Sequence, residues 1–153
     1  MKNMNITKLG TLIGDWSNIN DKLLQQISNL FKLRDCNINL DIQKTNTVSP
    51  FIKDNLEHYH LDNPFTIKRI CIHLTDWEPG HFYCFDNDIH TGWKAGDVYS
   101  VDWHKTSYAS ANAGASDRII LQLTGIVSEE SNEFLARLKR FDKYTLELKE
   151  SSW

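Results

Sequence analysis

The sequence predicts a mainly β domain with flanking helices, in which a jelly roll is the natural candidate for the core. Three observations predict this class. Residues from about 36 to 126 contain several short segments of alternating or β-branched residues, as strands do. Turn-forming residues interrupt these segments at short intervals, a pattern typical of sandwiches and barrels. On both sides of this region, apolar residues recur at helical spacing. The turn signals are Pro79-Gly80, Asp86-Asn87-Asp88, Gly96-Asp97 and Asn112-Ala113-Gly114.

The N-terminal part, about 5 to 34, is predicted to form one strand and one helix. The strand covers about Ile6 to Ile13, and the helix begins near Ser17 or Asn18, either of which can cap a first turn. An apolar stripe on this helix is suited to packing on a sheet. The residues of the stripe are Leu23, Leu24, Ile27, Leu30 and Phe31.

The core region, about 36 to 126, is predicted to contain strands at Asn37–Gln43 and Thr66–Leu74. Its last part, from His104 to Gly125, predicts a hairpin with a turn at about Asn112 to Asp117. A hairpin would place the two strands side by side in one sheet.

A second helix is predicted at about 128 to 141. Ser128 to Ser131 offer several N-caps, and Glu129 and Glu130 favour the positive end of the helix dipole. Its apolar stripe consists of Phe134, Leu135, Leu138 and Phe141.

Length and composition indicate one cytoplasmic domain. The chain has 153 residues, which is one domain by the usual prior. Its 17 basic and 20 acidic side chains give a net charge of −3, so no basic field predicts nucleic-acid binding. No apolar run is long enough for a membrane helix, and the first residues lack the apolar stretch of a secretory signal. Three widely spaced cysteines indicate reduced thiols rather than a disulfide framework.

All six histidines lie between His58 and His104, and this stretch contains His60-Leu61-Asp62. Residues two apart in an extended strand point the same way, so His60 and Asp62 can face a single ion, and His58 could join them. Histidine is the commonest protein ligand for a transition metal, and a carboxylate can complete one edge of the site. The alternative is a polar strand edge that happens to carry histidines.

Arg118 begins a strand that is otherwise strongly apolar. An arginine that enters a β core is costly unless it meets an anion. Arg118 is therefore a candidate anion-binding residue. The alternative is a surface-facing arginine at the first residue of the strand.

Together these motifs resemble the iron(II)- and 2-oxoglutarate-dependent oxygenases, whose fold is a double-stranded β-helix, a cupin-like jelly roll. His60-Leu61-Asp62 matches the family motif that supplies two metal ligands, and Arg118 matches the arginine that binds the distal carboxylate of 2-oxoglutarate. The resemblance covers about 56 to 125 and includes small phage-encoded and aspartyl/asparaginyl-hydroxylase-like members. The similar linking segments are Trp77-Glu78-Pro79-Gly80-His81-Phe82, Trp93-Lys94-Ala95-Gly96-Asp97 and Ala111-Asn112-Ala113-Gly114, followed by Leu121-Gln122-Leu123-Thr124-Gly125.

The resemblance implies Fe(II) as the metal, 2-oxoglutarate as the cosubstrate and dioxygen as the oxidant. Two imidazoles and one carboxylate leave three adjacent positions on iron for the cosubstrate and dioxygen. The substrate would be a small molecule or a protein side chain. Two alternatives are a non-catalytic jelly-roll or cupin-like binding or structural protein, and a cupin-type dioxygenase that needs iron but no cosubstrate.

The third metal ligand departs from the family pattern. That ligand usually lies nine or ten residues before the arginine, where this chain has Tyr108 and Ala109, whereas His104 lies fourteen residues before it. His104 and Tyr108 share strand parity, but four residues separate them by about 13 Å along an ideal strand. A bulge could bring His104 to the metal, and otherwise Tyr108 takes the position. We expect His104.

The remaining candidates are predicted to be peripheral. Arg69 is a second candidate for carboxylate binding, and it shares a strand face with His73 that is expected to be a polar outer face. His81 and His90 are expected to be exposed or to line a cavity mouth.

Overall fold

The computed structural model describes residues 6–52, 66–102 and 106–146, which form a mainly β structure with two helices. This confirms the predicted β-rich class. The elements are β1 (Ile6–Ile13), α1 (Asp21–Phe31), β2 (Arg34–Gln43), β3 (Thr47–Ile52), β4 (Ile67–His73), β5 (His81–Phe85), β6 (Asp88–His90), β7 (Asp97–Val101), β8 (Tyr108–Asn112), β9 (Arg118–Ile126), α2 (Glu129–Phe141) and β10 (Lys143–Thr145). Among the described residues, no helix is long and apolar enough to cross a membrane.

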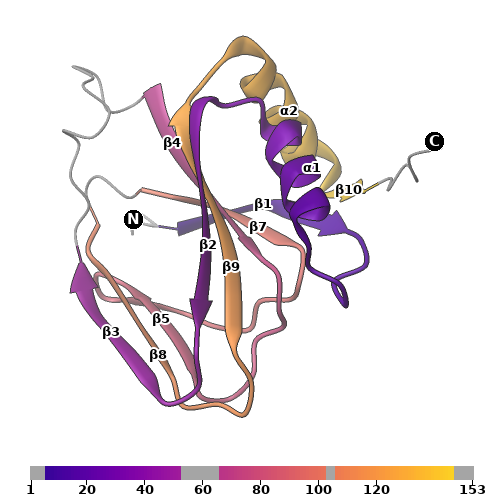
Figure 1. The fold of residues 1–153 in the computed structure, drawn as a ribbon. Helices are drawn as coiled ribbons and strands as arrows, with labels where there is room; N and C mark the ends of the chain where they lie inside the picture. The colour runs from indigo at the N-terminus through magenta and orange to yellow at the C-terminus, as the bar shows by residue number, and fades with distance from the viewer. Residues whose placement is uncertain (1–5, 53–65, 103–105, 147–153) are drawn as a thin grey trace.

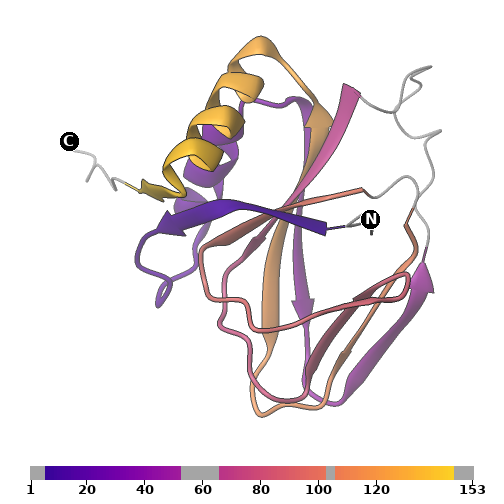
Figure 2. The same ribbon diagram turned by 180° about the vertical axis from the view of Figure 1, so that it is seen from behind.

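The strands form two sheets. The larger has the order β10-β1-β7-β4-β9-β2, and the smaller has the order β3-β8-β5-β6. Strands β1 and β10 are parallel, and the other pairs are antiparallel. Both helices lie on one face of the larger sheet, and the smaller sheet lies on its other face (Figures 1 and 2). The larger sheet is therefore the middle of three layers.

Two hydrophobic cores lie on opposite faces of the larger sheet. One joins the helices to it, for example through Ile27 of α1, Ile72 of β4 and Leu121 of β9. The other fills part of the space between the sheets and includes Cys71 of β4 and Tyr83 of β5. Strands β4 and β9 are covered on both faces, so most of their side chains are buried.

Helix α1 begins later than predicted. The expected start near Ser17 or Asn18 is wrong, because Asn20 is the N-cap and its side chain accepts a hydrogen bond from the backbone N–H of Leu23 at 3.0 Å. Ser17 instead donates its backbone N–H and hydroxyl to Asp15, which makes a local turn before the helix. Several capping residue types in a row make the start ambiguous from sequence.

Helix α2 confirms the prediction for about 128 to 141. Ser128 is its N-cap, and Ser131 completes a capping box with it, through hydrogen bonds of 2.6 and 3.0 Å. The αL conformation of Asp142 ends the helix.

The predicted hairpin between His104 and Gly125 is wrong. Strand β8 pairs with β3 and β5 in the smaller sheet, whereas β9 pairs with β2 and β4 in the larger one. The turn after Asn112 therefore crosses from one sheet to the other. Local turn residues predict a change of direction, but they do not determine which sheet the next strand joins.

Candidate ligand site between the two sheets

The space between the sheets contains many buried polar side chains. Protein interiors are mostly apolar, and a buried polar group is costly unless a partner satisfies it. Three polar side chains of β9 are buried here: Arg118, Gln122 and Thr124. The other strands around this space contribute further buried polar residues, namely Gln43, His73, His81, His90 and Asn112. This composition favours a ligand-binding role for the interior.

Arg118 lies at the start of β9 and is almost fully buried, with 1% of its side chain exposed. Its Nη2 donates to Oδ2 of Asp41 at 3.0 Å, and its Nε donates to Oε1 of Gln43 at 3.1 Å, both on β2. Its guanidinium carbon lies 4.9 Å from the ring centroid of Tyr83, on the opposite sheet. The side chain thus enters the interior and does not face the surface.

The Nη1 group of Arg118 is buried, and no described residue accepts a hydrogen bond from it. A guanidinium has five N–H donors, two of them on Nη1, so both N–H groups of Nη1 remain unsatisfied in the interior. An anionic or carbonyl oxygen in the interior would satisfy them. The donor set of Arg118 therefore fits a carboxylate ligand.

A cavity of about 170 Å³ lies between β2 and β9 on one side and β3, β5 and β8 on the other. Its lining is predominantly polar and includes two of the groups that contact Arg118, Asp41 and Tyr83. The lining residues are Asn39, Asp41, Ser49, Pro50, Tyr83, Tyr108, Ala109, Ser110 and Gln122. A polar cavity of this size suits a small hydrophilic ligand rather than an apolar one.

Burial raises the pKa of Tyr83 above its usual value. The phenol therefore stays neutral at physiological pH and places no negative charge beside Arg118. The same cause raises the pKa of the Cys71 thiol to about 12. Arg118, beside Tyr83, is instead compensated by the opposite charge of Asp41 in their ion pair.

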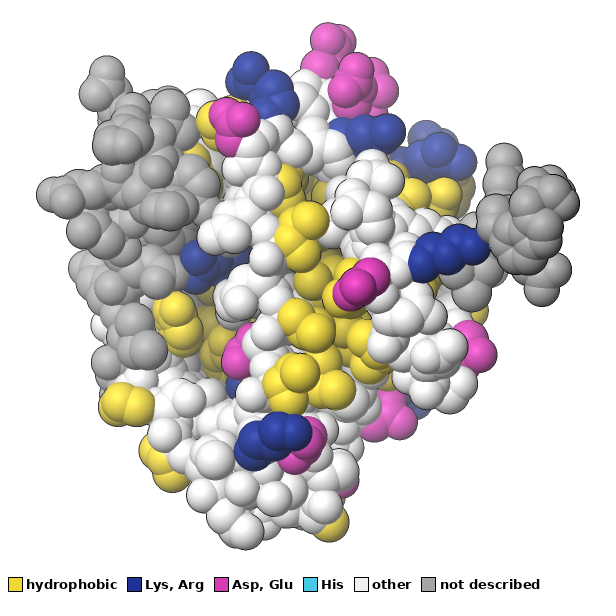
Figure 3. All heavy atoms as spheres, in the orientation of Figure 1, with side chains coloured by type: hydrophobic (Ala, Val, Ile, Leu, Met, Phe, Trp, Pro, Cys, Tyr) yellow, Lys and Arg dark blue, Asp and Glu magenta, His cyan; other side chains and the backbone are white. Residues whose placement is uncertain are grey.

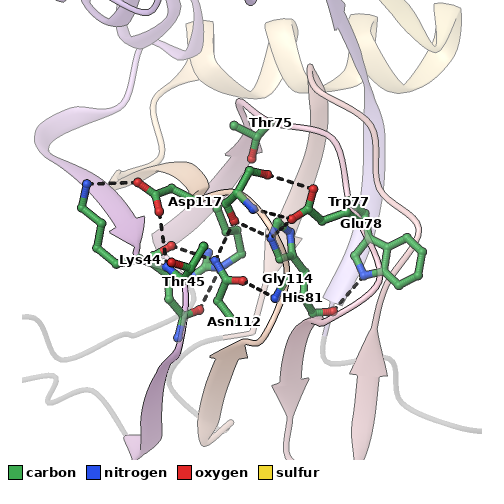
Figure 4. Close-up of polar contacts among 12 residues, drawn as sticks. Lys44, Thr45, Thr75, Trp77, Glu78, His81, Asn112, Gly114 and Asp117 are labelled. Carbon is green, nitrogen blue, oxygen red and sulfur yellow. Dashed lines mark hydrogen bonds and ion pairs between the residues drawn. The ribbon is translucent and has the colours of Figure 1, made fainter.

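Hydrogen bonds in the turn between β8 and β9 hold the backbone that leads into Arg118 (Figure 4). Glu78 accepts hydrogen bonds from the backbone N–H and the hydroxyl of Ser116, at 2.7 and 2.9 Å. These bonds lower the pKa of Glu78. The side chain of Asn112 donates to the carbonyl oxygens of Gln43 and Ser116, at 3.0 and 2.9 Å. The turn is thereby tied to both sheets.

His81 is fully buried beside this turn, contrary to the expectation of an exposed position. Its Nε2 lies 3.0 Å from the carbonyl oxygen of Ser116 and 3.3 Å from Oε1 of Glu78. The Trp77 indole donates to the carbonyl oxygen of His81 at 2.8 Å. His81 therefore helps to order the turn. The Pro79-Gly80 signal before His81 predicted a turn but did not indicate this role.

His73 and His90 form a second buried polar pair in the interior. Their Nε2 atoms lie 3.0 Å apart, and the His73 ring stacks on Trp93 at 4.2 Å between centroids. The expected polar outer face for His73 is wrong, because this face of β4 points toward the smaller sheet and leaves His73 with 1% exposure. His90 is also buried, although it lines a separate surface cavity.

Burial lowers the pKa of both histidines, that of His90 from 6.5 to about 4. The native state therefore binds fewer protons than the unfolded state between pH 4 and 6.5. We expect the free energy of unfolding to fall as the pH drops through this window, with His90 contributing roughly 3 kcal/mol of the loss by pH 4. Denaturant titrations at several pH values would measure it.

His90→Phe provides the comparison for this pH effect. The variant keeps an aromatic ring but removes one titrating group, so its stability should fall less in acid. At neutral pH it should lose roughly 1–3 kcal/mol, because the buried His73 loses its hydrogen-bond partner. Parallel losses in acid for the variant and the wild type would contradict a role for His90.

The predicted metal ligands His60, Asp62 and His104 lie outside the described residues. Tyr108, the alternative third position, begins β8 opposite Ile52 and Phe85 and lines the polar cavity. Within the described ranges, no group of three or more His, Cys, Asp or Glu residues could hold a metal ion.

Arg69, the second candidate for carboxylate binding, lies on the interior face of β4. Its Nε donates to the hydroxyl of Thr124 on β9 at 2.8 Å. Two arginines of the larger sheet, Arg69 and Arg118, therefore have polar partners on neighbouring strands.

Sequence reasoning missed Asp41, Gln43, Tyr83 and Gln122 as residues of this site. A signal existed in β2, where polar residues alternate with Ile38, Leu40 and Ile42. Alternation usually indicates that the apolar face is buried, but here these three side chains are 44%, 36% and 45% exposed and the polar face contains the partners of Arg118. Figure 3 shows a band of hydrophobic side chains on this outer face.

Comparisons with known proteins found little similarity. No family model matches the chain, and no curated protein matches it. Among solved structures, it is similar to one described as "Non-heme monooxygenase, ThoJ-Ni complex", with 16% sequence identity and a TM-score of 0.49. The match covers 59% of this chain and 42% of that one, so the chain spans about two fifths of that protein's length.

Proposed function

We propose that this chain is an iron(II)- and 2-oxoglutarate-dependent oxygenase that hydroxylates a small molecule or a protein side chain. One observation carries the proposal. Arg118, at the start of β9, is buried beside a polar cavity, and its Nη1 lacks a partner among the described residues. A guanidinium in this state is suited to the distal carboxylate of 2-oxoglutarate.

The strand order supports a double-stranded β-helix as the core of this oxygenase. From β2 to β9, the first strand pairs with the last, β3 with β8, β4 with β7 and β5 with β6. This nested pairing across two facing sheets is the arrangement of an eight-stranded jelly roll. If strands β2 to β9 form the jelly-roll core, then β1, β10 and the two helices are additions to that core.

His60, Asp62 and His104 are the proposed iron ligands, with Tyr108 as the alternative to His104. Iron(II) held by two imidazoles and one carboxylate would supply three adjacent positions for 2-oxoglutarate and dioxygen. The described ends of the flanking strands are neighbours in each sheet: Ile52 is opposite Tyr108, and Val101 is opposite Arg69.

The residues of the chain have separate tasks in this proposal. Arg118 binds and orients the distal carboxylate through Nη1. Tyr83 lies over the guanidinium and, as a neutral phenol, adds no repulsion toward the anion. Glu78 and Asn112 hold the turn before Arg118, so that the guanidinium keeps its place in the interior.

Succinate formation tests the function directly. The purified protein should convert 2-oxoglutarate to succinate slowly in the presence of Fe(II) and dioxygen, even without its own substrate, and a chelator should stop the reaction. Oxygen consumption without succinate would instead indicate a dioxygenase that needs no cosubstrate.

A non-catalytic binding protein is the second candidate, and one observation favours it. Asp41 already pairs with Arg118 at 3.0 Å, so the buried positive charge is neutralised by the protein itself. Such a protein should purify without stoichiometric iron and form no succinate. The same assay therefore separates the two candidates.

The third metal ligand can be identified by two substitutions. If His104 binds iron, His104→Ala should weaken metal binding and stop turnover, whereas Tyr108→Phe should leave metal affinity within about twofold. If Tyr108 is the ligand, its phenolate would favour ferric iron and give a coloured band that Tyr108→Phe removes. Metal titration followed by absorbance and activity measures both effects. Unchanged metal binding in both variants would contradict the proposed site.

A further inference from the structure

The ion pair between Arg118 and Asp41 uses part of the surface that a bound carboxylate would need. A carboxylate typically binds a guanidinium through two parallel hydrogen bonds. In Arg118, Nε donates to Gln43 and Nη2 donates one N–H to Asp41, which leaves both N–H groups of Nη1 and the second N–H of Nη2 for a ligand. A ligand carboxylate bound across Nη1 and Nη2 would therefore share Nη2 with Asp41 and lie beside its negative charge.

Asp41 is the partner that can move. Its side chain is 35% exposed and lies on β2, at the edge of the larger sheet, whereas that of Arg118 is 1% exposed. Turning Asp41 toward water costs little desolvation, while moving the buried guanidinium would cost much more. Asp41 also lines the polar cavity, so its negative charge would repel an anionic ligand there.

We infer that Asp41 is an internal competitor for the carboxylate site of Arg118 and keeps the affinity for 2-oxoglutarate low. This inference rests on the proposed function, because it concerns the same cosubstrate. Without a ligand, Asp41 compensates the buried charge of Arg118. With 2-oxoglutarate bound across Nη1 and Nη2, the two carboxylates repel each other and Asp41 turns toward solvent.

The inference is tested by measuring equilibrium binding to the full chain with the substitution Asp41→Asn. This substitution keeps the size of the side chain and removes its charge. The probes are 2-oxoglutarate with Mn(II), measured by calorimetry, and glutarate without metal, measured by NMR titration. We expect both ligands to bind at least about tenfold more tightly than to the wild type, because a like charge near the anion has been removed.

Two variants serve as controls. Asp41→Glu keeps the charge at the same position and should bind 2-oxoglutarate no more tightly than the wild type. Asp35→Asn removes one charge from an exposed position near the start of β2, whereas Asp41 lies near the end of that strand. This control should change binding by less than about twofold. Circular dichroism confirms that each variant is folded, and Asp41→Glu keeps the test informative if Asp41→Asn is unstable.

The outcomes separate this inference from the proposed function. If the wild type binds 2-oxoglutarate and Asp41→Asn binds it equally or more weakly, the inference is overturned while the proposed function stands. If the wild type binds neither ligand and Asp41→Asn binds glutarate, the competitor role is supported but the proposed function fails. If neither protein binds either ligand, both are overturned.

Discussion

Replacing His60 or Asp62 with alanine should abolish iron-dependent succinate formation. Each change removes one of the three proposed protein ligands, and the remaining two would hold iron(II) too weakly to support turnover. We expect activity below detection in both variants. Succinate assays and metal titrations, with circular dichroism to confirm folding, measure the result.

Glu57→Gln is the control for these two variants. It removes a carboxylate from the same segment but outside the His-x-Asp motif, so turnover should persist. Retained turnover in both His60→Ala and Asp62→Ala would refute the metal assignment. Loss of activity in Glu57→Gln as well would indicate that the segment is sensitive to substitution in general.

Arg118→Lys should raise the concentration of 2-oxoglutarate needed for half-maximal activity by about tenfold or more. Lysine keeps the charge but loses the planar fork, so it cannot form parallel hydrogen bonds to a carboxylate. It also cannot keep the bonds to Asp41 and Gln43 together, and we expect a loss of roughly 1–3 kcal/mol in the free energy of unfolding. Steady-state kinetics and denaturant titration measure the two effects.

Metal binding should hardly change in Arg118→Lys, because the arginine is not a proposed ligand. Arg69→Lys is the matched comparison on the neighbouring strand β4. If Arg69→Lys raises the cosubstrate requirement and Arg118→Lys does not, the carboxylate-binding role belongs to Arg69. If neither variant changes it, 2-oxoglutarate does not bind to these arginines.

Local patterns predicted many of the elements correctly. The strand at 6 to 13 and the helix at about 128 to 141 follow from alternation, apolar spacing and capping residues, which act over a few neighbours. Arg118 could be recognised as unusual because a charged residue at the start of an otherwise apolar strand requires a partner.

Long-range pairing could not be predicted in the same way. The segment from His104 to Gly125 contains turn signals, yet β8 and β9 lie in different sheets. The inward face of β4 also differs from the prediction, because the polar residues Arg69 and His73 point between the sheets. The first error concerns which strands pair, and the second concerns which face of a strand is covered. Both depend on residues that are distant in the chain.

By itself, the sequence determined the mainly β class and the position of helix α2, and it identified Arg118 as a candidate anion-binding residue. Only the tertiary structure decided which face of β2 is turned inward. Alternation defines two faces of a strand but not which one is covered, and β2 exposes Ile38, Leu40 and Ile42 while its polar face lies against the ligand site. Asp41 and Gln43 thus became partners of Arg118 through the antiparallel pairing of β2 with β9, which brings together residues more than seventy positions apart in the chain.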